Sequence, residues 1–167
     1  MNYFELYDIP VRLDTDPALL RKKWQEVSRV YHPDRFANAT GAERAIALQK
    51  SSLNNDAYRT LKDSDATLGY VLRLLGILEE DEKYALPPAF LMEMMELNEA
   101  VGNASMAPDM IHEARREYEA VMADWARQTS ALAQRFNAGE RSGELLGTLK
   151  DYYFRKKYLL RLKERLA

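Results

Sequence analysis

The sequence predicts an all-α protein built from two groups of helices. Apolar residues recur every three or four positions through most of the chain, and no segment alternates strictly between apolar and polar residues as a strand does. Proline and glycine separate these periodic stretches, as they do at helix boundaries. An acid-rich, proline-stopped segment at residues 76–86 is the predicted linker between a first domain at 1–75 and a second at 87–167.

Composition limits the classes of protein that this chain can represent. Of its 167 residues, 47% are apolar and 30% are charged, which is enough for a packed core. No run of about 18 apolar residues occurs, so no membrane helix is expected. The first residues have neither the basic start nor the apolar stretch of a secretory signal, and the absence of cysteine excludes disulfides and thiolate metal sites. We therefore expect a cytoplasmic protein without a membrane partner.

The first domain is expected to contain a helical hairpin flanked by two short helices. A short aromatic cluster ends at Pro10, and Asp16 before Pro17 is typical of the start of a helix. The hairpin follows. The buried stripe of its first helix is predicted to be Leu20, Trp24, Val27 and Tyr31, and that of its second helix Ile46, Leu53, Ala57 and Leu61.

A fourth helix closes the first domain in this prediction. Ser64 or Asp65 is expected to cap its start, and Gly76 to mark its end. Its predicted stripe is Leu68, Val71, Leu72 and Leu75.

The second domain is expected to be an antiparallel three-helix bundle, with breaks near residues 102–108 and 137–143. At about 100° per residue, one face of its first helix is apolar and should form the core: Phe90, Met94, Leu97 and Val101. The middle helix has a longer stripe: Ile111, Ala114, Tyr118, Val121, Trp125, Leu132 and Phe136.

The tripeptide His32-Pro33-Asp34 is the most specific motif of the chain. Pro33 disfavours helical geometry at His32 and removes a backbone donor, so the hairpin should turn here and expose both flanking side chains. The preceding helix carries basic residues off its buried stripe, at positions 21, 22 and 29. The loop is therefore predicted to lie beside a positive face.

A second candidate binding surface lies on the first helix of the bundle. Leu91, Met92 and Met95 fall away from its core face, and Glu96 and Glu99 border them. Exposed leucine and methionine commonly mark docking sites. The alternative is that the first domain covers these side chains within the same chain.

These motifs carry a resemblance to a known family. Residues 1–75 resemble a J-domain, and the whole chain resembles the HscB family of J-type co-chaperones in iron–sulfur cluster assembly. The resemblance rests on Tyr3-Phe4-Glu5-Leu6, on Tyr31-His32-Pro33-Asp34-Arg35-Phe36-Ala37, on the spacing of Gln49, Leu53, Asn54, Ala57, Tyr58 and Leu61, and on Phe90-Leu91-Met92-Glu93 followed by Glu96-Leu97.

The resemblance implies two partners. An Hsp70-type chaperone, HscA or DnaK-like, would bind the loop and the adjacent basic face and would be stimulated to hydrolyse ATP: His32, Pro33, Asp34, Arg21, Lys22 and Arg29. An IscU-type scaffold protein would bind the second surface, and its iron–sulfur cluster transfer would be promoted: Leu91, Met92, Met95, Glu96 and Glu99. An aromatic residue of the last helix would join that surface, and Tyr152, Tyr153 and Phe154 are the candidates.

Other functions have weaker support. The chain has two histidines, His32 and His112, and no glycine-rich phosphate loop, so we predict no catalytic residue, metal or cofactor. The alternative is a nucleic-acid-binding protein that uses the basic residues of 150–165 with interleaved aromatics. The same aromatics fit the inner face of a bundle, and the acids of 79–99 would repel a polyanion, so no nucleic-acid partner is expected.

Overall fold

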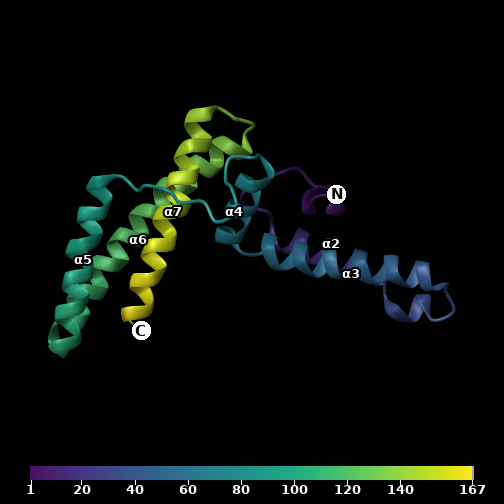
Figure 1. Ribbon diagram of the computed structural model, residues 1–167, viewed down its shortest axis with the longest axis horizontal. Helices are drawn as coiled ribbons and strands as arrows, with labels where there is room; N and C mark the ends of the chain where they lie inside the picture. The colour runs from purple at the N-terminus through teal and green to yellow at the C-terminus, as the bar shows by residue number, and fades with distance from the viewer. Residues whose placement is uncertain (167) are drawn as a thin grey trace. The chain divides into compact units, whose positions relative to one another are not determined.

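The computed structural model describes residues 1–166, apart from the side chains of residues 104–106 and 108. All regular elements in this part of the chain are helices, which confirms the predicted all-α class (Figure 1). They are α1 (Tyr3–Tyr7), α2 (Pro17–Val30), the short 3₁₀ helix η1 (Pro33–Phe36), α3 (Gly41–Leu61), α4 (Ser64–Leu74), α5 (Pro88–Met106), α6 (Pro108–Asn137) and α7 (Gly143–Leu166). The chain divides into two compact units, Met1–Leu74 and the residues from Leu75 onward.

In the first unit, α2 and α3 form the predicted hairpin, with η1 in the turn between them (Figure 1). The predicted start of α2 is confirmed, because the Asp16 carboxylate accepts from the backbone N–H of Ala18 at 3.3 Å and Pro17 occupies the first turn. The stripe of α2 also faces inward, with Leu20 buried and the other three residues half-buried.

A buried polar network joins α1 to this hairpin. The hydroxyl of Tyr7 donates to the side-chain oxygen of Asn54 at 2.9 Å, and Asn54 is only 1% exposed. The amide of Asn54 donates in turn to the carbonyl of Trp24 and to the hydroxyl of Ser28, both at 3.0 Å. Burial raises the pKa of Tyr7 well above its usual value. The network therefore satisfies polar groups on three helices at once.

The predicted stripe of α3 is wrong at Ile46, which is 55% exposed. The buried positions are Ala47, Asn54, Ala57 and Leu61, which recur at intervals of seven, three and four residues. Ile46 lies about 100° away from Ala47 around the helix. The inward face of α3 thus consists of two alanines, one asparagine and one leucine, and Ile46 lies outside it.

Two details of α4 also differ from the prediction. Asp63, and not Ser64 or Asp65, caps the helix, because its carboxylate accepts from the N–H of Ala66 at 2.8 Å. Leu75 lies beyond the last residue of α4 and is 39% exposed. The expected end at Gly76 is confirmed by its left-handed backbone, with φ of 71°.

In the second unit, α5, α6 and α7 form the predicted three-helix bundle (Figure 1). Its main core consists of Phe90, Met94, Leu97, Tyr118, Leu159 and Leu162. All four core positions predicted for α5 are buried, and the predicted stripe of α6 is buried or half-buried throughout. The break expected at 102–108 is confined to Ala107, since α5 continues through Gly102.

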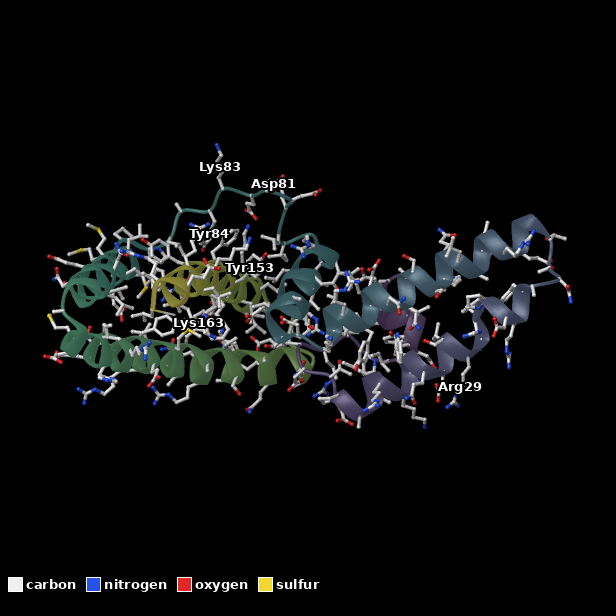
Figure 2. The ribbon with its side chains drawn as sticks, turned by 90° about the horizontal axis from the view of Figure 1, so that it is seen from below. Arg29, Asp81, Lys83, Tyr84, Tyr153 and Lys163 are labelled. Atoms are coloured by element: carbon white, nitrogen blue, oxygen red, sulfur yellow. The ribbon has the colours of Figure 1, made fainter. Side chains whose placement is uncertain are left out.

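The segment before α5, residues 82–86, packs against the bundle and contacts α7. The carboxylate of Glu82 pairs with the ammonium of Lys150, and Leu86 packs against the main core. Between them, the hydroxyl of Tyr84, which is labelled in Figure 2, donates to the Asp151 carboxylate at 3.0 Å. Residues 82–86, which the sequence assigned to a linker, are therefore fastened to the second unit.

No helix within residues 1–166 has the length and apolar character needed to cross a lipid bilayer.

Candidate functional site

The loop at the turn of the hairpin is held by hydrogen bonds of its own. The backbone N–H of Asp34 donates to Nδ1 of His32 at 3.3 Å, and the N–H of Arg35 donates to the His32 carbonyl at 3.0 Å. Pro33 fixes the first residue of η1. The side chains of His32 and Asp34 are exposed and lie 3.6 Å apart. The loop thus presents an imidazole and a carboxylate in a defined geometry.

The basic residues predicted to flank this loop are exposed on α2. Arg21, Lys22 and Arg29 all have exposed side chains (Arg29 is labelled in Figure 2). Arg21 and Arg29 are eight residues apart, which corresponds to about 12 Å along the helix axis. They fall within about 100° around α2, opposite its buried Leu20. These three cations therefore form one positive face on the helix that leads into the loop.

The apolar residues predicted to form the second surface are also exposed. Met92 is 64% exposed, Met95 is 66% exposed and Leu91 is 36% exposed. The adjacent Met94, by contrast, is fully buried in the bundle core. Glu96 and Glu99 are exposed as well. We call Leu91, Met92, Met95, Glu96 and Glu99 the α5 patch; one element brings all five predicted residues together.

The aromatic residues of α7 divide between two flanks of that helix. The carbonyl of Tyr152 accepts from the indole N–H of Trp125 on α6 at 3.1 Å. Phe154 instead stacks on Tyr84, with ring centroids 4.6 Å apart and planes within 3°. Tyr158 meets Phe90 of α5 edge to face at 6.2 Å. The rings of Phe154 and Tyr158 therefore pack within the second unit, whereas the nucleic-acid alternative requires rings that are free to stack on bases.

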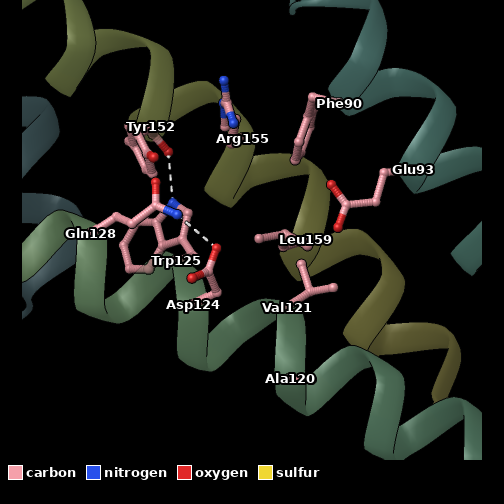
Figure 3. A pocket seen from close by; sticks show the side chains of 10 residues that line it. All are labelled: Phe90, Glu93, Ala120, Val121, Asp124, Trp125, Gln128, Tyr152, Arg155 and Leu159. Atoms are coloured by element: carbon pink, nitrogen blue, oxygen red, sulfur yellow. Dashed lines mark hydrogen bonds between the residues drawn. The ribbon is translucent and has the colours of Figure 1, made fainter.

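A small cavity of about 270 Å³ lies between α5, α6 and α7 (Figure 3). Asp124 and Arg155, two of its charged residues, have neighbours within the lining. The amide of Gln128 donates to the Asp124 carboxylate at 2.7 Å, and the guanidinium of Arg155 lies 5.0 Å from the ring centres of both Phe90 and Tyr152. Glu93 and Asp124 are the two carboxylates of its lining, and Asp124 is the one with a hydrogen bond to another lining residue.

The two histidines lie in different units, His32 on the hairpin loop and His112 at the exposed start of α6. Within the part of the chain that the structure describes, no group of three or more histidine, aspartate or glutamate side chains is placed to hold a metal ion.

Sequence reasoning overlooked Tyr84. It assigned this residue to a linker, although an isolated aromatic side chain between acidic residues and two prolines was a signal that the segment packs against something. The structure places the ring of Tyr84 on Phe154, next to the beginning of α5.

Comparisons with known proteins agree with this architecture. Residues 86–167 match the family model described as the HSCB C-terminal oligomerisation domain. The chain is 33% identical to the co-chaperone protein HscB homolog of Shewanella oneidensis, over 100% of this chain and 95% of that one. It is 41% identical to the corresponding protein of Vibrio cholerae over 110 residues, which are 65% of this chain and 64% of the relative.

Solved structures of HscB proteins match this chain over nearly its whole length. The chaperone HscB from Vibrio cholerae matches with a TM-score of 0.75 and 30% identity, covering 99% of this chain and 95% of that one. The human co-chaperone protein HscB matches with a TM-score of 0.79 and 26% identity, covering 99% of this chain and 80% of that one.

A J-type hairpin with an exposed His-Pro-Asp loop, followed by a three-helix bundle, defines a J-domain protein with a C-terminal helical domain. The chain belongs to the HscB family, whose members are named as co-chaperones.

Proposed function

We propose that this protein is a cytoplasmic co-chaperone that binds an IscU-type iron–sulfur scaffold protein and delivers it to a specialised Hsp70 of the HscA or DnaK type. It stimulates the ATPase of that Hsp70 and so promotes cluster transfer from the scaffold. The main observation behind this proposal is the loop of His32, Pro33 and Asp34. It is held by an internal hydrogen bond and is exposed at the end of a helix with a positive face. Membership of the HscB family supports it further.

The loop is already ordered before it binds the Hsp70, which lowers the entropic cost of binding. Because its hydrogen bonds are internal, the imidazole and carboxylate lose little freedom when the partner binds. Arg21, Lys22 and Arg29 attract an acidic surface and raise the association rate. The chaperone supplies the catalytic groups for ATP hydrolysis, and this chain supplies a binding surface.

The α5 patch binds the scaffold. Met92 and Met95 are unbranched and adaptable side chains that gain favourable contacts when water is excluded from them. Glu96 and Glu99 give this apolar centre a polar border. Of the three aromatic candidates on α7, we assign Phe154 to this surface, because it lies on the flank of α7 that Tyr158 shares with α5.

Binding measurements test the proposal directly. Calorimetric titration of the full-length protein with the scaffold, and separately with the Hsp70 in its ATP-bound state, should give saturable binding to each. Binding of both partners supports the proposal. Failure to bind either of them contradicts it, and salt-sensitive retention on nucleic acid would then favour the alternative function.

A further inference from the structure

The segment before α5 holds an aromatic side chain in a fixed position. Three anchors act on it in sequence: the Glu82–Lys150 ion pair, the Tyr84–Asp151 hydrogen bond of 3.0 Å, and Leu86 in the bundle core. Tyr84 nevertheless remains only half-buried. A connecting segment needs no such fixation, whereas a ring held in place can contact a partner without a large entropic cost.

The seam between α5 and α7 leads from this ring to the α5 patch. On α7, positions 154, 158, 161 and 165 recur every three or four residues and share one face. Tyr158 contacts Phe90 edge to face, and Arg165 donates to the side chain of Asn98, so this face lies along α5. Phe154 and Arg161 are therefore on the same seam.

The α5 side of the seam can be placed in the same way. Leu91, Met95 and Asn98 are spaced by four and three residues and share a face of α5. Because Asn98 contacts Arg165, Leu91 and Met95 also lie along the seam. Tyr84 begins this apolar stripe four residues before α5, where its ring stacks on Phe154.

Charge is distributed unequally on the two sides of the stripe. Glu96 and Glu99 border it on α5, whereas the exposed cations Lys157 and Arg161 border it on α7. The ammonium of Lys157 lies 5.6 Å from the centre of the Phe154 ring, which places this positive charge next to the aromatic pair. A partner segment that fits here is apolar along its middle, with a carboxylate toward α7.

We propose that Tyr84 and Arg161 complete the surface that binds the scaffold protein, Tyr84 as an aromatic anchor and Arg161 as the contact for an acidic side chain of the scaffold. This inference rests on the proposed function and extends it from α5 across the seam to α7. Tyrosine and arginine are the residue types enriched at the energetic centres of protein interfaces. The two residues also fix the orientation of the bound segment.

The experiment measures the affinity of full-length variants for the IscU-type scaffold. Tyr84→Ala should weaken binding by about tenfold, whereas Tyr84→Phe, which keeps the ring, should stay within about twofold of the wild type. Lys150→Ala is the matched control, since it removes an anchor of the segment but not the ring. It should bind nearly as well as the wild type. A photo-crosslinking residue at position 84 should capture the scaffold, and one at position 152 should not.

The charge assignment has its own pair of variants. Arg161→Glu should weaken scaffold binding at low salt by about five- to tenfold, and added salt should reduce this difference. Lys163→Glu makes the same charge change on the α6 side of α7, where Lys163 lines a groove with Tyr118 and Met122, and should have little effect (Figure 2).

The outcomes separate this inference from the function on which it rests. Wild-type binding that Met92→Ala with Met95→Ala weakens, but Tyr84→Ala and Arg161→Glu do not, overturns this inference and leaves the proposed function intact. Equal losses in Tyr84→Ala and Lys150→Ala also overturn it, because the segment would then act only by supporting α5. A wild-type protein that does not bind the scaffold overturns both.

Discussion

The backbone N–H of Asp34 donates to Nδ1 of His32 at 3.3 Å, so the loop that carries both side chains closes on itself. The side chains of His32 and Asp34 both stay exposed, with Nδ1 of the imidazole 3.6 Å from the carboxylate. A loop of this kind can be recognised as a preformed unit.

The positive face of α2 leads to a salt-dependent prediction. Replacing Lys22 and Arg29 together by glutamate should slow association with the Hsp70 at low salt by about tenfold or more, because complementary charges steer the encounter. Stopped-flow association at increasing salt should show the difference from the wild type shrinking. Arg44→Glu with Arg59→Glu, an equal charge change on exposed positions of α3, is the control and should have a smaller effect.

The α5 patch predicts a loss of binding without a loss of stability. Met92→Ala with Met95→Ala should weaken scaffold binding by about 1–3 kcal/mol, since both side chains are exposed in the free protein and are the apolar contacts that we propose for the scaffold. Met94→Ala is the matched control, because this neighbour is fully buried and its truncation should cost about 2–5 kcal/mol of folding stability. Equal stability losses in the two variants would contradict the assignment.

The buried Tyr7–Asn54 network predicts that replacing Asn54 lowers the folding stability of the first unit. Asn54→Ala removes the buried side-chain partner of the Trp24 carbonyl and the Ser28 hydroxyl, and it leaves the Tyr7 hydroxyl with the backbone carbonyl of residue 54 alone, so the first unit should lose about 1–3 kcal/mol of stability. Hydrogen exchange of the slowest amides of α3 measures this change. Asn55→Ala removes only an exposed hydrogen bond to the Trp24 indole and should cost less; the reverse order would show that the network does not hold the hairpin.

The Glu82–Lys150 pair predicts how acid affects the second unit. The hydrogen bond from Lys150 is the main cause that lowers the pKa of Glu82 below its ordinary value. A carboxyl with a lowered folded-state pKa stabilises fully above its unfolded pKa of about 4.3 and loses that effect as pH falls through the folded value. The difference in urea midpoint between the wild type and Glu82→Gln should therefore close below about pH 4.

Glu80→Gln is the control for this prediction, because Glu80 is an exposed carboxylate of the same segment. A wild-type advantage over Glu82→Gln that persists unchanged at pH 3 would contradict the ion-pair explanation.

The sequence predicts the helices well where amphipathic periodicity is strong. Phe90, Met94, Leu97 and Val101 repeat at intervals of three and four residues, and each is buried in the bundle. The same reasoning places Met92 and Met95 outside the core. It succeeds because a helix in a small bundle has one buried face, and its largest apolar residues occupy that face.

Periodicity fails where the buried face is not the most apolar one. α3 turns Ala47 and Asn54 inward and leaves Ile46 exposed, because close packing of the hairpin favours small side chains and the Tyr7 hydroxyl needs a polar partner. The spacing of apolar residues along the sequence could not predict that Tyr84 stacks on Phe154, because these two residues are 70 positions apart. Such long-range pairings depend on the assembled bundle.

The proposed co-chaperone function is tested most directly by single-turnover ATP hydrolysis by the specialised Hsp70, measured with and without this protein and with the scaffold added. We predict that the wild type accelerates hydrolysis, that the scaffold increases this effect, and that His32→Gln abolishes it while scaffold affinity and helix content stay unchanged. Equal stimulation by the wild type and His32→Gln would contradict the role of the loop. Absence of stimulation by the wild type would contradict the co-chaperone function itself.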